Sequence, residues 1–184
     1  MASSSSSAST SASASSPVIL LAVTLENFKT FAPGIHRIPL PRGFSCITGA
    51  NGVGKSNLLD AVCFAIGDAP ARLRVKSLAE LSGSPGLRTH VEVTVQQHGG
   101  TTVRLASAIV DGVRFFLLNG TRVPKHRFDE TLSGLGLLLG GSCVWRISQT
   151  DRKASMTPDE LHDAVCETSG TKVFNGKKSA KTYQ

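Results

Sequence analysis

The sequence contains no apolar run of 18 or more residues, so it predicts no membrane-spanning helix. Its four cysteines lie far apart and form no C-x-x-C pair, which argues against a disulfide scaffold or a zinc site. Internal repeats and long heptad repeats are also missing. What remains is a chain of 184 residues, 40% of them hydrophobic, which is enough for one globular domain with a core.

Acidic residues are fewer than basic ones, and the balance leaves a net charge of +7. A basic surface is compatible with nucleic acid and with a nucleotide-binding protein, and does not choose between them. Cys46 and Cys63 lie within apolar runs, so both are predicted to be reduced core residues.

Residues 1–17 consist almost entirely of serine and alanine. Such a segment cannot bury enough apolar surface to offset the entropy of ordering, so we expect a disordered tail. Its serine content and lack of acids are features of organellar transit peptides, but it has no arginine and no amphipathic pattern. A plain flexible tail is the favoured interpretation.

The feature that organises the chain is GANGVGKS, which fits the phosphate-binding P-loop pattern G-x-x-x-x-G-K-[ST]. Its glycines allow the backbone N–H groups to curl around an anion, and a helix beginning near Gly54 adds its positive end. Lys55 is expected to reach the phosphates, and Ser56 to bind Mg²⁺. The predicted nucleotide-binding residues of this stretch are Gly49, Ala50, Asn51, Gly52, Val53, Gly54, Lys55, Ser56 and Asn57.

The flanks agree with this interpretation. Residues 44–48 predict a short strand before the loop, and apolar residues at helical spacing follow it. Gly67 is placed to end that helix, with Pro70 just beyond. A strand, a glycine-rich loop and a helix form the setting that a P-loop requires.

The other predicted elements surround this unit. Two strands precede it, and their order places an antiparallel sheet beside the P-loop. Three further strands form a meander with a hairpin turn at Asp111-Gly112. A capping box from Thr157 to Glu160 begins a late helix. The predicted strands are 18–25, 35–40, 91–97, 103–110, 114–118 and 143–148, and the predicted helices are 125–132 and 158–168. The fold class is therefore α/β, with a mixed sheet, an antiparallel meander and flanking helices.

Four segments resemble the amino-terminal head segment of the structural maintenance of chromosomes (SMC) family of ABC-type ATPases. They are LENFKTF at 25–31, ITGANGVGKSNLLDAVCFAIG at 47–67, LNG at 118–120 with Phe128 and Leu135-Gly136, and ETSGT at 167–171. The resemblance implies that residues 18–170 form the N-terminal lobe of such a head. Residues 171–184 would then begin its coiled-coil helix.

The resemblance also implies ligands, partners and further site residues. Lys29 and Thr30 would lie near ATP, and Gln149 would bind Mg²⁺ with Ser56. Arg72 or Arg74 would contact DNA or couple to the ATPase cycle. The implied partners are a C-terminal lobe from the same or another chain, a second head around ATP, and DNA. The implied location is the chromosome, in the nucleus of a eukaryote or otherwise in the cytoplasm and nucleoid. Gln149 is followed by Thr150, where this family usually has glycine.

A hydrolytic half-site is not found in the sequence. Hydrolysis in this family needs a signature loop and an aspartate–glutamate pair after an apolar strand, and no such pair is present. Residues 132–136 are similar to a signature loop in composition but precede Gln149, in the wrong half. We therefore expect a lobe that binds ATP and hydrolyses little alone. The alternatives are a DNA-binding scaffold with a vestigial P-loop, a small P-loop kinase, and a recombination-repair head.

Overall fold

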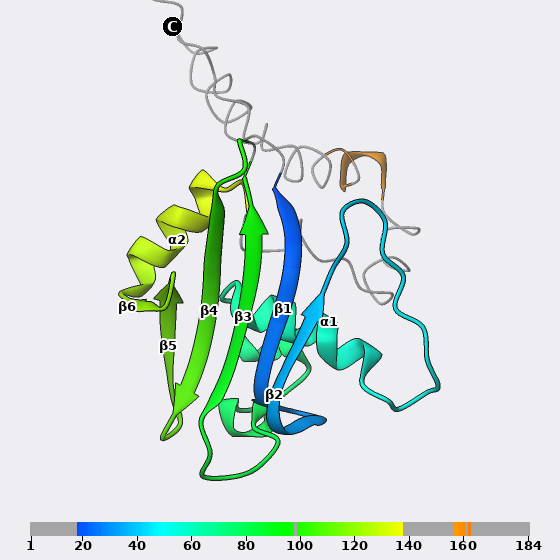
Figure 1. The fold of residues 1–184 in the computed structure, drawn as a ribbon, viewed down its shortest axis with the longest axis vertical. Coiled ribbons are helices and arrows are strands. Elements are labelled where there is room, and N and C mark those ends of the chain that lie inside the picture. Colours follow the sequence, from blue (N-terminus) through cyan, green and yellow to red (C-terminus); the bar gives the residue numbers. More distant parts are fainter. Residues whose placement is uncertain (1–17, 98, 138–156, 161, 163–184) are drawn as a thin grey trace, which may run out of the picture.

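The computed structural model describes residues 18–97, 99–137, 157–160 and 162 (Figure 1). Its centre is a six-stranded sheet in the order β2-β1-β3-β4-β5-β6. The strands are β1 (Ile19–Phe28), β2 (Phe31–Pro39), β3 (Thr89–Gln96), β4 (Thr102–Val110), β5 (Val113–Leu118) and β6 (Thr121–Val123). All five neighbouring pairs are antiparallel. The α/β class and the meander are confirmed. A mixed sheet was expected, whereas the sheet is antiparallel throughout the described residues.

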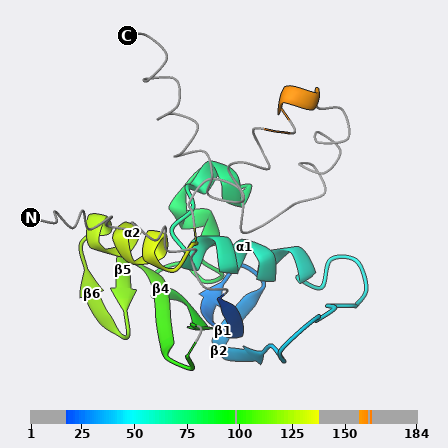
Figure 2. The same cartoon turned by 90° about the horizontal axis from the view of Figure 1, so that it is seen from above.

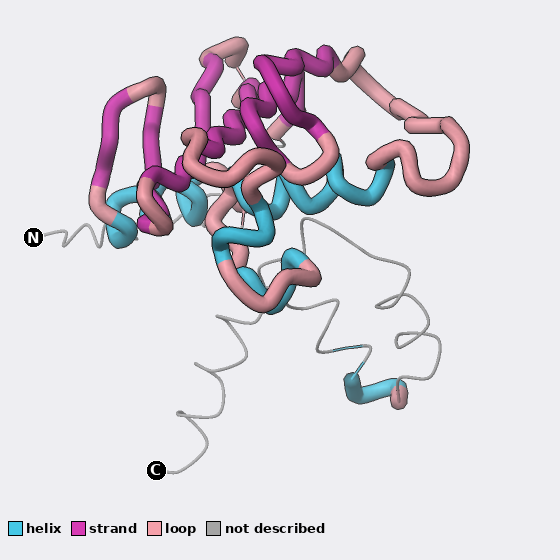
Figure 3. Tube along the Cα trace, turned by 90° about the horizontal axis from the view of Figure 1, so that it is seen from below, coloured by secondary structure: helices cyan, strands magenta, loops and turns pink. Residues whose placement is uncertain are grey.

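Helices cover one face of this sheet. They are α1 (Lys55–Ala65) and α2 (Lys125–Gly134), with two short 3-10 turns, η1 (Pro70–Leu73) and η2 (Leu78–Leu81). Views from above and from below both place α1 and α2 on the same side of the strands (Figures 2 and 3). No helix in the described part of the chain has the length and apolar character that a membrane crossing requires.

Alternating side chains decide which face of the sheet is covered. In β3 every second residue from Thr89 to Val95 is buried and the residues between are half-buried. Val93 pairs with Val23 of β1 and Leu105 of β4, so these three side chains lie on one face. Phe64 of α1 packs on this layer, its ring centroid 5.6 Å from that of Phe28. The core therefore lies between the sheet and α1.

Tight turns join the strands of the meander. Asp111 and Gly112 have φ of 51° and 75°, the left-handed values of a type I′ hairpin. Asn119 and Gly120 repeat this pattern with φ of 50° and 83°. The predicted turn at Asp111-Gly112 is confirmed.

Two predictions about the segment before the P-loop are wrong. Residues 44–48 form no strand, and the chain from 41 to 50 is exposed. A strand needs a neighbour to share its hydrogen bonds, and neither edge strand of the described sheet pairs with this segment. Cys46 is consequently exposed, whereas Cys63 is buried in α1 as predicted.

Several predicted features lie outside the described residues. They are the tail 1–17, the strand 143–148 with Gln149, most of the helix 158–168, and the segment 171–184. The described beginning of that helix contains the predicted capping box. The Thr157 N–H donates to Glu160 Oε2 at 2.9 Å, and the Glu160 N–H donates to Thr157 Oγ1 at 3.4 Å. These two hydrogen bonds confirm that helix's start.

Candidate nucleotide-binding site

The loop 49–54 turns the chain into the N-terminus of α1. Gly49, Gly52 and Gly54 have φ of 157°, 85° and 102°, a region that residues with a Cβ rarely adopt. The Gly54 carbonyl accepts hydrogen bonds from the N–H groups of Asn57 and Leu58 at 2.9 and 3.1 Å. The earlier N–H groups of a helix's first turn have no intrahelical acceptor. The loop therefore presents the donors that an anion needs.

Lys55 is the first residue of α1, and its side chain lies back over the loop. Its Nζ donates to the carbonyl oxygens of Gly49 and Ala50 at 2.6 and 2.5 Å. The ammonium group is thus held at the loop, within the same few residues as the open N–H groups. Asn51, Val53 and Ser56 are exposed around it. The predicted P-loop residues are brought together at one end of α1.

The turn between β1 and β2 lies against this loop. Asn57 Nδ2 donates to Thr30 Oγ1 at 3.0 Å. A Cβ placed on Gly54 would lie 2.7 Å from the same oxygen, so glycine is needed for this close approach. Thr30 therefore borders the P-loop.

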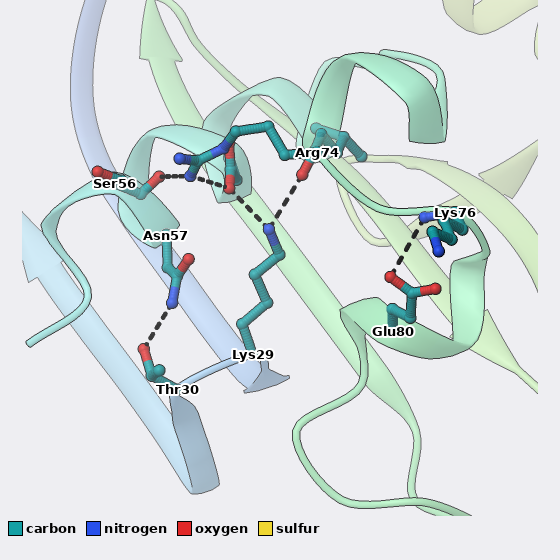
Figure 4. A network of polar contacts seen from close by, with 9 residues as sticks. Lys29, Thr30, Ser56, Asn57, Arg74, Lys76 and Glu80 are labelled. Atoms are coloured by element: carbon teal, nitrogen blue, oxygen red, sulfur yellow. Dashed lines mark hydrogen bonds and ion pairs between the residues drawn. The ribbon is translucent and has the colours of Figure 1, made fainter. Parts of the chain in front are cut away.

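Lys29 lies beside Thr30 but points to a different partner. Its Nζ donates to Asp60 Oδ2 at 2.7 Å and to the Leu73 carbonyl at 3.0 Å. Arg74 reaches the same Asp60 oxygen at 2.6 Å and the Ser56 carbonyl at 3.4 Å. Figure 4 shows the ends of the Lys29 and Arg74 side chains approaching each other, with Asn57 and Thr30 nearby. We call Lys29, Asp60 and Arg74 the charge cluster.

Asp60 was missed from the sequence. It is fully buried and lies at the centre of the charge cluster. The available signal was a carboxylate in the middle of the apolar helical pattern that follows the P-loop. Arg72 belongs to η1, but its side chain is outside the described part of the structure.

A polar corner fixes the backbone that carries Lys29 and Thr30. Asn27 has φ of 51° and is buried. Its amide nitrogen donates to Ser82 Oγ, the Ser84 carbonyl and the Leu87 carbonyl, and its amide oxygen accepts from the Ser84 N–H. Each polar atom of this side chain is satisfied, so the loop 82–87 and the β1–β2 turn are held together.

A mainly apolar cavity of about 810 Å³ lies next to Lys55, which is one of its lining residues. It is bounded by β1, by the chain that leaves β2 and by α1, with Leu20, Leu40, Leu58 and Val62 among its lining residues. Residues of the exposed segment 41–50 also line it, and Phe44 there is 93% exposed. This combination is typical of a surface that another element covers.

Similarity to known proteins was found at three levels. A model of the RecF/RecN/SMC N terminal domain family matches residues 19–139. The chromosome partition protein Smc of Gloeobacter violaceus is 42% identical over 159 residues, which cover 77% of this chain and 14% of that protein. The Smc of Aquifex aeolicus is 30% identical over 167 residues, covering 85% of this chain and 14% of that protein. The chain thus spans about one seventh of the length of these relatives.

Solved structures agree in fold. The Smc head domain of Pyrococcus furiosus, solved with an extended coiled coil and bound to the C-terminal domain of ScpA, has a TM-score of 0.75 at 22% identity, covering 89% of this chain and 44% of that one. A chain from a study of ATP-driven dimerization of SMC ATPases has a TM-score of 0.70 at 22% identity, covering 79% of this chain and 96% of that one. At this identity the likeness concerns the fold alone.

Proposed function

The chain belongs to the RecF/RecN/SMC N-terminal domain family, and from this membership we propose that residues 18–170 are the ATP-binding N-terminal lobe of a chromosome-organising ATPase. The observation that carries the proposal is the P-loop geometry. Left-handed glycines, open first-turn N–H groups and the Lys55 ammonium lie together at the N-terminus of α1.

The residues present fit a Mg²⁺-bound triphosphate. Gly49 and Gly52 allow a close approach of phosphate to the backbone, and Lys55 needs only to exchange two carbonyl acceptors for phosphate oxygens. Ser56 is exposed in the first turn of α1, where its hydroxyl would bind Mg²⁺. Gln149, outside the described residues, is proposed as the second protein ligand. Lys29 and Thr30 are proposed to form the adjoining wall.

A titration with Mg-ATP tests this function. We expect the full chain to bind saturably and the Lys55→Ala variant to lose at least tenfold in affinity, because the lysine supplies the only side-chain cation of the motif. Lys125→Ala is the matched control, since Lys125 is an exposed lysine on α2 that pairs with Asp129. Equal affinity of wild type and Lys55→Ala would overturn the proposal.

Hydrolysis is proposed to need a C-terminal lobe. The apolar cavity and the exposed side chains Phe44 and Ile47 support this, because they provide a surface for further strands beside the P-loop. Two such heads would then enclose ATP. We expect little turnover from this chain alone. Rapid hydrolysis that Lys55→Ala abolishes would show that the catalytic carboxylate is within these residues.

DNA binding is the second candidate, favoured by the net charge of +7. Arg72 and Arg74 are the proposed contacts. A non-catalytic scaffold would bind DNA with a strong salt dependence that Lys55→Ala leaves unchanged, and would bind no Mg-ATP. In either case we propose a location on the chromosome, in the nucleus of a eukaryote or the nucleoid of a bacterium.

A further inference from the structure

The charge cluster joins three segments that are distant in sequence. Lys29 lies in the turn after β1, and Asp60 lies in the second turn of α1. Arg74 is the C-cap residue of η1. The Asp60 carboxylate is fully buried, and a buried carboxylate is tolerated only with strong partners. Two cations approach one of its oxygens at 2.7 and 2.6 Å. The cluster therefore fixes these segments relative to one another.

Backbone conformation marks the same positions. Lys29 and Arg74 have φ of 48° and 60°, a region that costs a side-chain-bearing residue energy. Neither residue is asparagine or aspartate, the types that tolerate this region best. Both are held there by side chains that end on Asp60. Backbone strain is therefore retained at both cationic residues of the charge cluster, which indicates that the positions of Lys29 and Arg74 matter.

The cluster reaches the P-loop along two routes. Arg74 donates to the Ser56 carbonyl at 3.4 Å, one helical turn before Asp60. Thr30, next to Lys29, accepts from Asn57 at 3.0 Å and lies against Gly54. The first turn of α1 is thus contacted on both sides by segments that Asp60 holds in place.

We propose that Asp60 is a positioning residue of the nucleotide site, which through Arg74 fixes the backbone of Ser56 and so the hydroxyl that binds Mg²⁺. This rests on the proposed function. Asp60 itself is fully buried, so we do not place its carboxylate among the groups that contact the nucleotide. Its loss should therefore weaken the Mg²⁺-dependent part of binding, while the loop N–H groups and Lys55 continue to bind phosphate.

The test compares ATP affinity in Mg²⁺ and in EDTA for the full chain and the Asp60→Asn variant, with unfolding followed in parallel. We expect affinity in Mg²⁺ to fall at least tenfold and affinity in EDTA to fall less than threefold. A merely structural role would lower both equally. A purely electrostatic role would raise both, because one negative charge near the phosphates is removed. Either of these results would overturn the proposal.

Arg74→Gln is the second variant, since Arg74 is half-exposed and its loss leaves the Lys29–Asp60 pair in place. It should show the same selective loss in Mg²⁺. The affinity of the double variant for ATP in Mg²⁺ should lie within twofold of that of the weaker single variant, because both changes break the same contact from Asp60 through Arg74 to Ser56. Additive losses would contradict the proposal. Asp129→Asn, in the Lys125–Asp129 pair on α2, is the control and should leave both affinities unchanged.

The failures of the two proposals are distinguishable. If wild type binds no Mg-ATP, or binds it equally well after Lys55→Ala, the proposed function fails. If Lys55→Ala abolishes binding but Asp60→Asn and Arg74→Gln bind like wild type in Mg²⁺, the function stands and the positioning role is wrong.

Discussion

The two ends of α1 are completed in different ways. At the C-terminal end the N–H groups of Gly67 and Asp68 bond back to Phe64 and Cys63 at 3.1 and 3.0 Å, and Arg114 donates to the carbonyls of Phe64 and Asp68. At the N-terminal end the chain supplies a loop of glycines and one lysine. The C-terminal end is completed within the fold, whereas the N-terminal end is the site at which we propose that phosphate binds.

This difference separates a packed end of α1 from an exposed one. Arg114 lies between the rings of Phe64 and Phe116, at 4.4 and 5.0 Å from their centroids. Burial lowers the pKa of Arg114 to about 10, so it remains charged at neutral pH. The interactions of Arg114 stabilise the core. The P-loop, by contrast, is exposed and contributes little packing.

The largest effect on stability is expected at the C-terminal end of α1. Arg114→Met should lower the free energy of unfolding by about 2–4 kcal/mol, because the hydrogen bonds of a half-buried cation to two carbonyls are lost. Denaturant titration measures this. Arg122→Met is the control, since Arg122 is exposed and stacks on Phe115 at the surface. Equal effects of the two changes would show that Arg114 does not cap the helix.

A smaller effect on stability, but a larger one on binding, is expected at the N-terminal end. Gly54→Ala should cost about 1–2 kcal/mol, because alanine is strained at φ of 102° and its Cβ meets Thr30 Oγ1. It should also remove detectable Mg-ATP binding, measured by titration. Gly134→Ala on α2 has open space for a Cβ and should be neutral or slightly stabilising. Unchanged Mg-ATP binding by Gly54→Ala would show that this glycine is not part of the nucleotide site.

The exposed segment before the P-loop should tolerate change. Phe44→Ser with Ile47→Ser should alter the free energy of unfolding by less than about 0.5 kcal/mol, because these side chains are 93% and 50% exposed. Val93→Ala is the control, because it removes apolar atoms from the core. It should lower the free energy of unfolding by about 1–3 kcal/mol. A loss above about 1 kcal/mol for the double variant would mean that the segment packs on the lobe.

The least effect is expected on the open face of the sheet. Burial, helped by Arg88, lowers the pKa of His90 from its ordinary value of 6.5. The unfolded chain therefore takes up a proton at higher pH than the folded chain does. Stability attributable to His90 is accordingly lost as the pH falls from 7 to 5. Urea titrations at both pH values should show a smaller loss in His90→Gln, while the exposed His126→Gln control should follow wild type.

Local patterns predicted much of this fold. Alternation in β3, the Asp111-Gly112 turn and Gly67 at the end of α1 each depend on neighbours in sequence, and each prediction is confirmed. The segment 44–48 was predicted wrongly because a strand depends on a partner, and its own residues cannot reveal whether one is present.

The sequence by itself determined the P-loop, since glycine spacing and a following helix are local properties of the chain. Only the tertiary structure shows which cations surround Asp60. Its two cationic partners are 31 and 14 residues away, and an isolated aspartate in an apolar helix does not say which distant cations will balance its charge.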